Sequence, residues 1–224
     1  MGKLPIDRSF VVEVLKELVA TNSVNPDVGK GPGESALSNL LFDRLTSITP
    51  LDVLKQPVAN ERSNVIAILR GTGEGRSLML NGHMDTVGVE GMVIEPFRPF
   101  VESGLLHGRG ACDMKGAIAA MIGAAKSLAD SKSKLRGDVI FSFVVDEEHL
   151  SIGIERLVEE YKADAAIVGN QPTWQSPQPT RAFFGSKSSS KEKLLMGLFL
   201  RKELTPLSTR PVSCLDSVGY KIHS

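Results

Sequence analysis

The sequence predicts an α/β fold in which helices cover both faces of a mostly parallel sheet. Several short segments are continuously apolar, as strands are when both faces of their sheet are covered. These segments alternate along the chain with longer segments whose apolar residues recur at helical spacing. In such sheets ligands bind beyond the carboxyl ends of the strands, so polar residues that follow a strand are the first candidates for function.

The expected helices and strands follow one another up to about residue 169. Helical spacing predicts helices over 7–20, 34–46, 115–129 and 154–162. Continuous apolar runs predict strands over 64–69, 77–82, 138–145 and 163–169. The helix over 115–129 is rich in Ala and Gly, which suits close packing. The turn "GTGEG" joins two strands and leads into no helix, which argues against a nucleotide-binding domain.

Composition and charge narrow the class of protein. The chain has 224 residues, 42% hydrophobic and 23% charged, which is enough for a globular domain with a sizeable core. Basic and acidic residues balance at 26 each, so nothing in the charge favours nucleic acid or an anionic membrane as a partner. Two cysteines are too few for a disulfide framework or a cysteine-ligated zinc site. No apolar run reaches the ~18 residues of a membrane helix and no signal peptide opens the chain, so we expect a soluble cytoplasmic protein.

The balance of charge changes sign near residue 173, which predicts a boundary there. Residues 174–224 carry eight basic and three acidic side chains, which leaves 18 basic and 23 acidic ones in residues 1–173. The later segment is rich in Pro, Ser, Gln and Lys and has no clear periodicity. We therefore expect a functional domain over 1–173 and a poorly ordered tail over 174–224.

The segment "VVDEEHLSIG" ends an apolar strand with three acids, Asp146, Glu147 and Glu148. Carboxylates side by side repel one another, and desolvation adds to the cost. A positive partner is therefore expected nearby. The plainer interpretation is a solvated acidic loop that begins a helix.

Two further polar clusters have the same character. In "NGHMDT", residues 81–86, strand alternation places His83 and Asp85 on one side, where the carboxylate can hold one ring nitrogen and orient the other toward a metal. In "HGRGACDMKG", residues 107–116, Asp113 stands where the Ala-rich helix begins. The plainer interpretations are a hydrogen-bonded histidine in a polar loop and a helix N-cap.

All three clusters would lie at the same edge of one sheet. Imidazole and carboxylate ligands together suit zinc, cobalt or manganese. A carboxylate that is not a ligand is then available as general base for metal-bound water. Two adjacent glutamates can thus share one site if one binds the metal and the other acts as the general base.

The segments "NGHMDTV", "GRGACDMKG" and "DEEHLSIG", in this order, closely resemble the M20 metallopeptidase family. That family includes acetylornithine deacetylase, succinyl-diaminopimelate desuccinylase, aminoacylase and carboxypeptidase-type members. The resemblance runs from about residue 7 to 169 and includes "ATNSVNP" after the first helix. It implies the family's zinc-peptidase catalytic domain, which is phosphorylase/hydrolase-like, with residues 1–173 as the N-terminal part of an incomplete copy.

The resemblance also implies a role for each matching residue. His83 would bind one metal, with Asp85 behind it as a catalytic residue, and Asp113 would bridge two metals. Glu147 would be the general base, and Glu148 would bind the metal that His83 does not contact. The cofactor would be two zinc ions, with cobalt or manganese possible in their place, and the substrate a small N-acyl amino acid or peptide whose amide bond is hydrolysed. Arg109 and Lys115 have no role that the resemblance assigns.

The sequence departs from the family after residue 169. A typical member is about twice as long, with two further metal ligands and an inserted domain often used for dimerisation, and we expect this chain to lack them. Asn170, in "IVGNQPT", stands where the family has an acid.

We hypothesise that the tail is read one reading frame out, because shifted codons permit Glu-Pro-Thr-Asp-Leu-Ala-Ile-Ala and, later, His-Lys-Gly and Ala-His-Gly. A genuine variant end is the alternative, and the nucleotide sequence beyond codon 169 decides between them.

Both explanations predict weak or no activity for this chain. The main hypothesis is a metal-dependent hydrolase of an N-acyl amino acid or small peptide. The competing hypothesis is an inactive fragment or pseudoenzyme that lacks two metal ligands and binds at most one metal. Bound zinc and the hydrolysis of N-acetyl amino acids distinguish the two.

Overall fold

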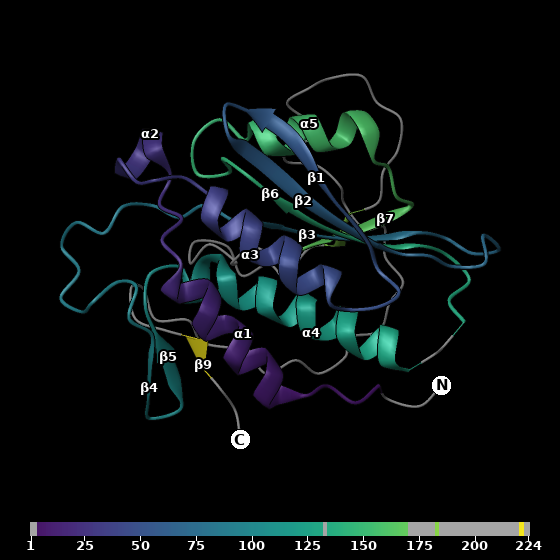
Figure 1. Cartoon of the computed structure of the whole chain (residues 1–224), viewed down its shortest axis with the longest axis horizontal. Helices are drawn as coiled ribbons and strands as arrows, with labels where there is room; N and C mark the ends of the chain where they lie inside the picture. Colours follow the sequence, from purple (N-terminus) through teal and green to yellow (C-terminus); the bar gives the residue numbers. More distant parts are fainter. Residues whose placement is uncertain (1–3, 132–133, 170–181, 184–219, 222–224) are drawn as a thin grey trace.

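The computed structural model describes residues 4–131 and 134–169, together with the backbone of 182–183 and 220–221. In this part of the chain a central sheet lies between helices on its two faces (Figure 1). The helices are α1 (Arg8–Ala20), α2 (Pro26–Gly29), α3 (Ser35–Thr46), α4 (Gly116–Asp130) and α5 (Ile152–Glu160). The central strands are β1 (Asp52–Ala59), β2 (Arg62–Leu69), β3 (Leu78–His83), β6 (Val139–Val144), β7 (Ala165–Val168) and β8 (Ala182–Phe183). The predicted α/β class is confirmed.

The central sheet is mixed, and most of its strands run in one direction. Its order is β1-β2-β6-β3-β7-β8. β3 pairs in parallel with β6 and β7, whereas β2 pairs antiparallel with both of its neighbours. β1, β6, β3 and β7 therefore share one direction, as the mostly parallel prediction requires. The antiparallel β2 was not anticipated, because its continuous burial looks the same in either direction.

Five strands of the described residues were not predicted from the sequence: β1, β8, β4 (Phe100–Glu102), β5 (Leu105–His107) and β9 (Tyr220–Lys221). β1 carries Lys55 and Pro57 and is only partly buried, as suits an edge strand. β4 and β5 are too short to show a pattern. They form a hairpin whose two turn residues, Ser103 and Gly104, both have positive φ. In a separate small sheet, β5 also pairs with β9.

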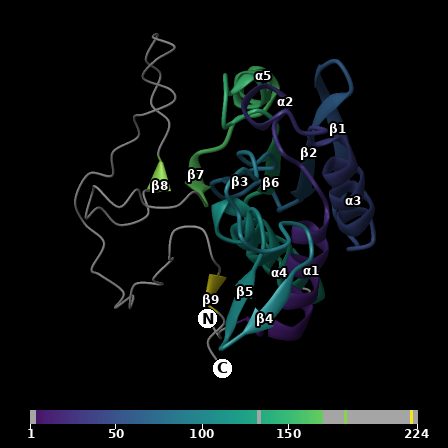
Figure 2. The same cartoon turned by 90° about the vertical axis from the view of Figure 1, so that its left-hand side faces the viewer.

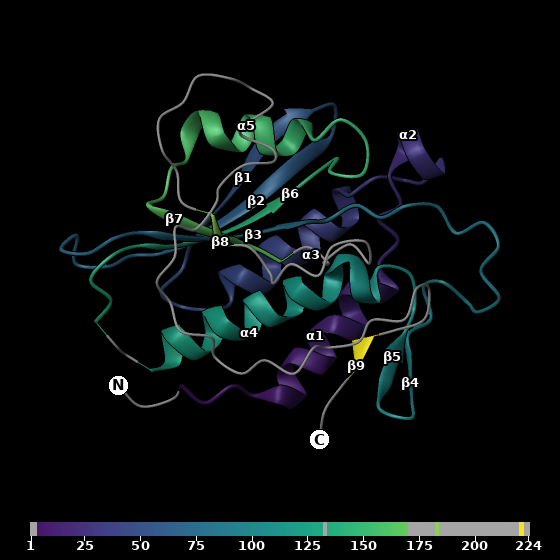
Figure 3. The same ribbon diagram turned by 180° about the vertical axis from the view of Figure 1, so that it is seen from behind.

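Helices cover both faces of the central sheet, as predicted. α1, α3 and α4 lie on one face and α5 lies on the other, which Figure 3 shows from behind. The larger apolar core fills the first layer, with Leu18, Leu41 and Phe141 among its buried members. α1 and α4 approach closely at Gly123, where a Cβ would come within 2.4 Å of a methyl group of Val11. The small residues of α4 thus permit the close packing that its composition predicted.

The hairpin β4-β5 lies at one end of the molecule beside α1 (Figure 2). Gly108, which follows it, has a φ of +147°, and a Cβ there would lie 2.3 Å from a methyl group of Val19. The chain can therefore pass this close to α1 only without a side chain. From there it reaches α4 through the irregular turn Ala111–Lys115.

No helix in the described ranges is both long and apolar enough to cross a membrane. The boundary near residue 173 and Asn170 lie outside the described residues, as does the tail apart from the backbone of β8 and β9. The predictions made for those positions stay predictions.

Candidate metal centre

The three predicted polar clusters meet at one edge of the central sheet. His83 is the last residue of β3, and Glu147 and Glu148 follow β6, in which Val144 pairs with His83. Because β3 and β6 run in the same direction, their carboxyl ends lie side by side. Asp113 reaches the same place from the turn before α4, and its Oδ1 lies 3.1 Å from His83 Nε2.

His83 is buried, and its two ring nitrogens face different partners. Nδ1 lies 3.0 Å from the backbone oxygen of Asp85, which only accepts hydrogen bonds, so Nδ1 carries the proton of the neutral ring. Nε2 faces Asp113 Oδ1 and Glu147 Oε2, 3.7 Å away, and is therefore the ring nitrogen that could bind a metal once it has lost its proton. The Asp85 carboxylate, expected to hold the ring, is 3.6 Å from Nδ1, so the backbone oxygen is the closer partner. The ring is nevertheless oriented as metal ligation requires.

Asp85 is fully buried and holds the backbone on which both glutamates stand. Its Oδ1 accepts a hydrogen bond of 3.0 Å from the Glu147 N–H, and its Oδ2 accepts one of 3.0 Å from the Glu148 N–H. The Asn25 side chain donates to Oδ2 at 2.8 Å. Burial by itself would raise the pKa of Asp85. The bonds with His83 and Asn25 lower it, so the side chain is an ionised acceptor.

Asp113 is not the N-cap of α4, because Lys115 holds that position and the Asp113 backbone is extended. The peptide bond between Asp113 and Met114 is cis. Met114 is buried beneath the end of β3, and its sulfur accepts a hydrogen bond from the His83 N–H at 3.2 Å. Gly82 makes room for it, since a Cβ there would lie 2.8 Å from the Met114 methyl group. The Asp113 side chain is 44% exposed, which leaves the site open to small molecules.

The electrostatics of this edge favour a positive charge. Burial by itself would lower the pKa of His83, but hydrogen bonds with Asp113 and Asp85 raise it well above its usual value. Burial raises the pKa of Glu147, and burial raises the pKa of Glu148 to about 7, with neighbouring carboxylates adding to both. Groups that retain protons because they are buried or lie among negative charges give up those protons when a divalent cation binds.

A set of imidazole and carboxylate donors converges here. One ligand atom each from His83, Glu147 and Glu148 lies within 4.8 Å of the others. Nitrogen and oxygen donors of these kinds fit zinc, cobalt or manganese. The residues present therefore fit the metal that the sequence predicted.

Asp146, the first acid of the run, lies in a different environment. The interpretation as a solvated loop is wrong for it, because its side chain is only 1% exposed. Arg62 Nη2 donates to its Oδ1 at 2.9 Å, and Arg62 also donates through Nε and Nη2 to both carboxylate oxygens of Glu34. The positive charge expected near the acidic run is thus, for Asp146, a guanidinium.

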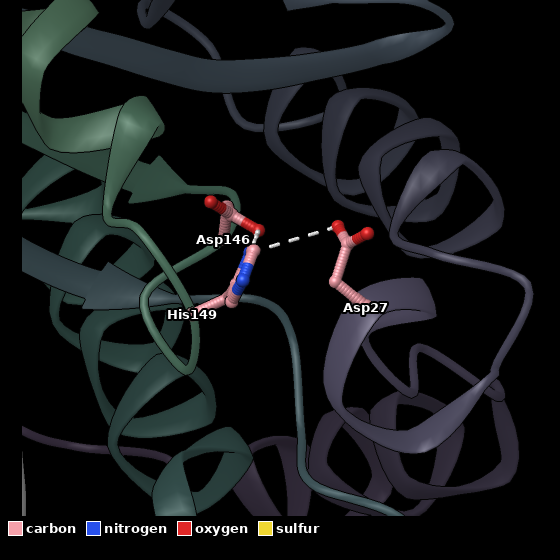
Figure 4. Close-up of side chains that lie close together, drawn as sticks. All are labelled: Asp27, Asp146 and His149. Atoms are coloured by element: carbon pink, nitrogen blue, oxygen red, sulfur yellow. Dashed lines mark ion pairs between the residues drawn. The ribbon is translucent and has the colours of Figure 1, made fainter.

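A second group of possible ligands consists of Asp27, Asp146 and His149 (Figure 4). His149 Nδ1 is 3.7 Å from Asp27 Oδ2 and 3.9 Å from Asp146 Oδ1. Arg62 Nη1 lies 3.7 Å from the same oxygen of Asp27. Because Arg62 already supplies a cation to both acids, we assign no metal to this group.

Asn25, Glu34 and Arg62 were not singled out from the sequence. Asn25 stands in "ATNSVNP", whose resemblance to the family was the only signal that pointed to it. Glu34 lies just before α3 and Arg62 begins β2, so both look like ordinary polar ends of elements. Nothing in their local pattern reveals that they meet.

Comparisons with known proteins show the family to which the chain is similar. The sequence model of peptidase family M20/M25/M40 matches residues 79–220, a range that extends beyond the predicted boundary. A succinyl-diaminopimelate desuccinylase of Leptothrix cholodnii is 35% identical over 72% of this chain and 44% of its own length. An N-formyl-4-amino-5-aminomethyl-2-methylpyrimidine deformylase of Bacillus subtilis is 40% identical over 75% of this chain and 40% of its own. The chain thus spans less than half the length of these relatives.

A solved structure shares the fold. The crystal structure of a tripeptidase from Staphylococcus aureus superposes with a TM-score of 0.61 at 24% identity. The superposition covers 74% of this chain and 44% of the tripeptidase.

Proposed function

Because the chain belongs to peptidase family M20/M25/M40, we propose that it is a metal-dependent hydrolase that cleaves the amide bond of an N-acyl amino acid or a small peptide. The names of its relatives support this substrate class, since a desuccinylase and a deformylase both remove an acyl group. The observation that carries the proposal is the convergence of His83, Glu147 and Glu148 at the ends of β3 and β6.

We assign the metal ligands as the family resemblance implies. His83, Asp113 and Glu148 would hold the metal, which is zinc by resemblance, with two ions as the expected number. When bound, such an ion polarises an amide carbonyl and acidifies water. Asp85 binds no metal in this proposal; it orients His83 through its backbone oxygen and Glu148 through its carboxylate.

Glu147 is the proposed general base. Its backbone is held by Asp85, while its side chain remains 38% exposed and reaches the site from the turn after β6. Burial raises the pKa of this carboxyl, which makes it a better proton acceptor than an ordinary glutamate. It would take a proton from the attacking water and deliver that proton to the leaving nitrogen.

Metal content and turnover of the full chain test the proposal. After incubation with zinc or cobalt and removal of excess ion, we expect bound metal and weak but measurable release of free amine from N-acetyl and N-succinyl amino acids. Glu147→Gln should keep the metal within a few-fold of wild-type affinity and lose turnover by roughly 10²–10⁴-fold. His83→Ala and Glu148→Gln should lose metal affinity, whereas the exposed Glu155→Gln serves as the control.

The outcomes separate the two hypotheses. Folded protein that binds no divalent metal would contradict the proposal. A single bound metal without turnover would instead support the inactive fragment.

A further inference from the structure

The turn that carries Glu147 and Glu148 is anchored through its backbone by buried polar residues. Asp85 accepts hydrogen bonds from both glutamate N–H groups. Asp146, the residue before them, donates its own N–H to Glu34 Oε1 at 3.0 Å. The position of the turn therefore depends on what holds Asp85 and Asp146 in place.

Asn25 joins these two carboxylates. Its side-chain nitrogen donates to Asp85 Oδ2 at 2.8 Å and to Asp146 Oδ1 at 3.1 Å. Its side-chain oxygen accepts from the Asp27 N–H at 2.9 Å, and its backbone N–H donates to the Thr86 oxygen at 2.9 Å. The residue is fully buried, so removal of its side chain takes a hydrogen-bond donor away from two buried carboxylates. Two buried carboxylates would then face each other without the donor that separates their charges.

Arg62 supplies the cation that pairs with Asp146 in this interior. Its side chain is 12% exposed and bridges Asp146 to Glu34, which is fully buried. Two parallel bonds of 2.7 Å fix the guanidinium on Glu34, and a third of 2.9 Å reaches Asp146. Loss of the guanidinium would leave two buried carboxylates without a cation, a situation that proteins tolerate poorly.

We infer that Asn25 and Arg62 are positioning residues of the metal centre. Through Asp85 and Asp146 they set the backbone from which Glu147 and Glu148 project. This inference rests on the proposed function, because it assigns the two residues an effect on metal binding. Partners that orient metal ligands typically change metal affinity about 10- to 100-fold when they are removed.

Cobalt titration of the full chain tests the inference. Cobalt affinity and the visible absorption band are measured for wild type, Asn25→Ala and Arg62→Gln, at a temperature where circular dichroism shows each protein folded. We expect each variant to bind cobalt about 10-fold more weakly or worse, with an altered band. A role in stability alone would lower the melting temperature and leave the affinity and band of the folded protein unchanged.

Arg70→Gln is the matched control. Arg70 follows the opposite end of β2 and, like Arg62, pairs with two carboxylates, Asp52 and Asp138. Its removal should leave the cobalt affinity and band unchanged. Asn25→Asp provides a second test if a larger change prevents folding, since it keeps the volume and replaces the donor with an acceptor; it too should weaken cobalt binding.

Unchanged cobalt affinity in folded Asn25→Ala, Asn25→Asp and Arg62→Gln would overturn the inference and leave the proposed function standing. Absence of cobalt binding by the wild-type chain would overturn the proposed function and the inference with it. The two failures are therefore distinguishable.

Discussion

Asp146, Glu147 and Glu148 are adjacent in the chain, yet their carboxylates lie in different environments. Asp146 turns into the interior and pairs with Arg62. Glu147 and Glu148 turn toward His83 and remain partly exposed. Asp146 has a positive φ of 66°, and this local bend separates its side chain from those that follow. Repulsion among the three acids is thus relieved by geometry and by separate partners.

A second residue-scale feature is Gly110, just before Ala111–Lys115. Its φ is +77°, and a Cβ would lie 2.7 Å from the Thr86 methyl group and 3.1 Å from Lys115 Cδ. We expect Gly110→Ala to lower the free energy of unfolding by about 1–2 kcal/mol for the left-handed backbone and a further ~1–3 kcal/mol for the overlap. Urea denaturation measures the sum of the two losses.

The control for this change is Gly73→Ala. Gly73 has nearly the same φ, +81°, and a Cβ there would meet no atom within 4 Å. It should therefore show the backbone cost alone. Equal losses in the two variants would contradict an overlap at Gly110.

At the scale of elements, the two ends of the central sheet are held by different chemistry. The end that carries the candidate metal centre uses buried carboxylates, an amide and a guanidinium. The opposite end uses acids that are partly buried or exposed and that accept backbone hydrogen bonds. Asp138, before β6, accepts from the Gly71 N–H at 2.8 Å, and Asp164, before β7, accepts from the Ser77 N–H at 2.7 Å. These bonds secure the loops without a role in the site.

The acid dependence of stability tests the bond made by Asp138. The Gly71 N–H and the Arg70 guanidinium lower the pKa of Asp138, so the ionised carboxylate stabilises the fold above its ordinary pKa. That contribution is lost as pH falls through the lowered value in the folded protein. We expect Asp138→Asn to cost up to about 1 kcal/mol at neutral pH, because the pair is largely exposed.

In acid the same variant should unfold at the same urea concentration as wild type. Urea midpoints at neutral pH and below the folded-state pKa of Asp138 supply the comparison. If the urea midpoint of the variant were lower than that of wild type by the same amount in acid, the charge of Asp138 would contribute nothing to stability.

At the scale of the whole molecule, the central sheet separates two apolar cores of unequal size. The layer with α1, α3 and α4 holds the larger core, and α5 covers a smaller one, to which it contributes the fully buried Leu157. Met114, whose sulfur accepts from the His83 N–H, belongs to the larger core, and Val144, which pairs with His83, belongs to the smaller one.

Because the two cores differ in size, we expect the layer with α5 to open to solvent more readily than the layer with α4. Leu157→Ala should cost about 2–5 kcal/mol and raise amide hydrogen exchange across α5 more than across α4. Leu41→Ala, which is equally buried in the larger core, is the control and should raise exchange in both helices. Equal increases in α5 and α4 after Leu157→Ala would contradict independent opening of the smaller layer.

Much of the fold and part of the site were predictable, for local reasons. The helix over 115–129 and the strands over 77–82 and 138–145 have strong patterns, and the structure confirms them as α4, β3 and β6. The short hairpin strands and the polar edge strand β1 were missed because they bury too little apolar surface to leave a pattern.

By itself the sequence determined the class of fold and the edge of the sheet where His83, Asp113, Glu147 and Glu148 gather, because periodicity and the residues after each strand are local properties. Only the tertiary structure decided that β2 runs antiparallel, that a backbone oxygen holds His83, and that Asp146 pairs with Arg62. Asn25 and Asp146 are 121 positions apart, and no local pattern specifies which buried donor meets which buried acceptor. That choice follows from how the whole chain satisfies its polar groups when it excludes water.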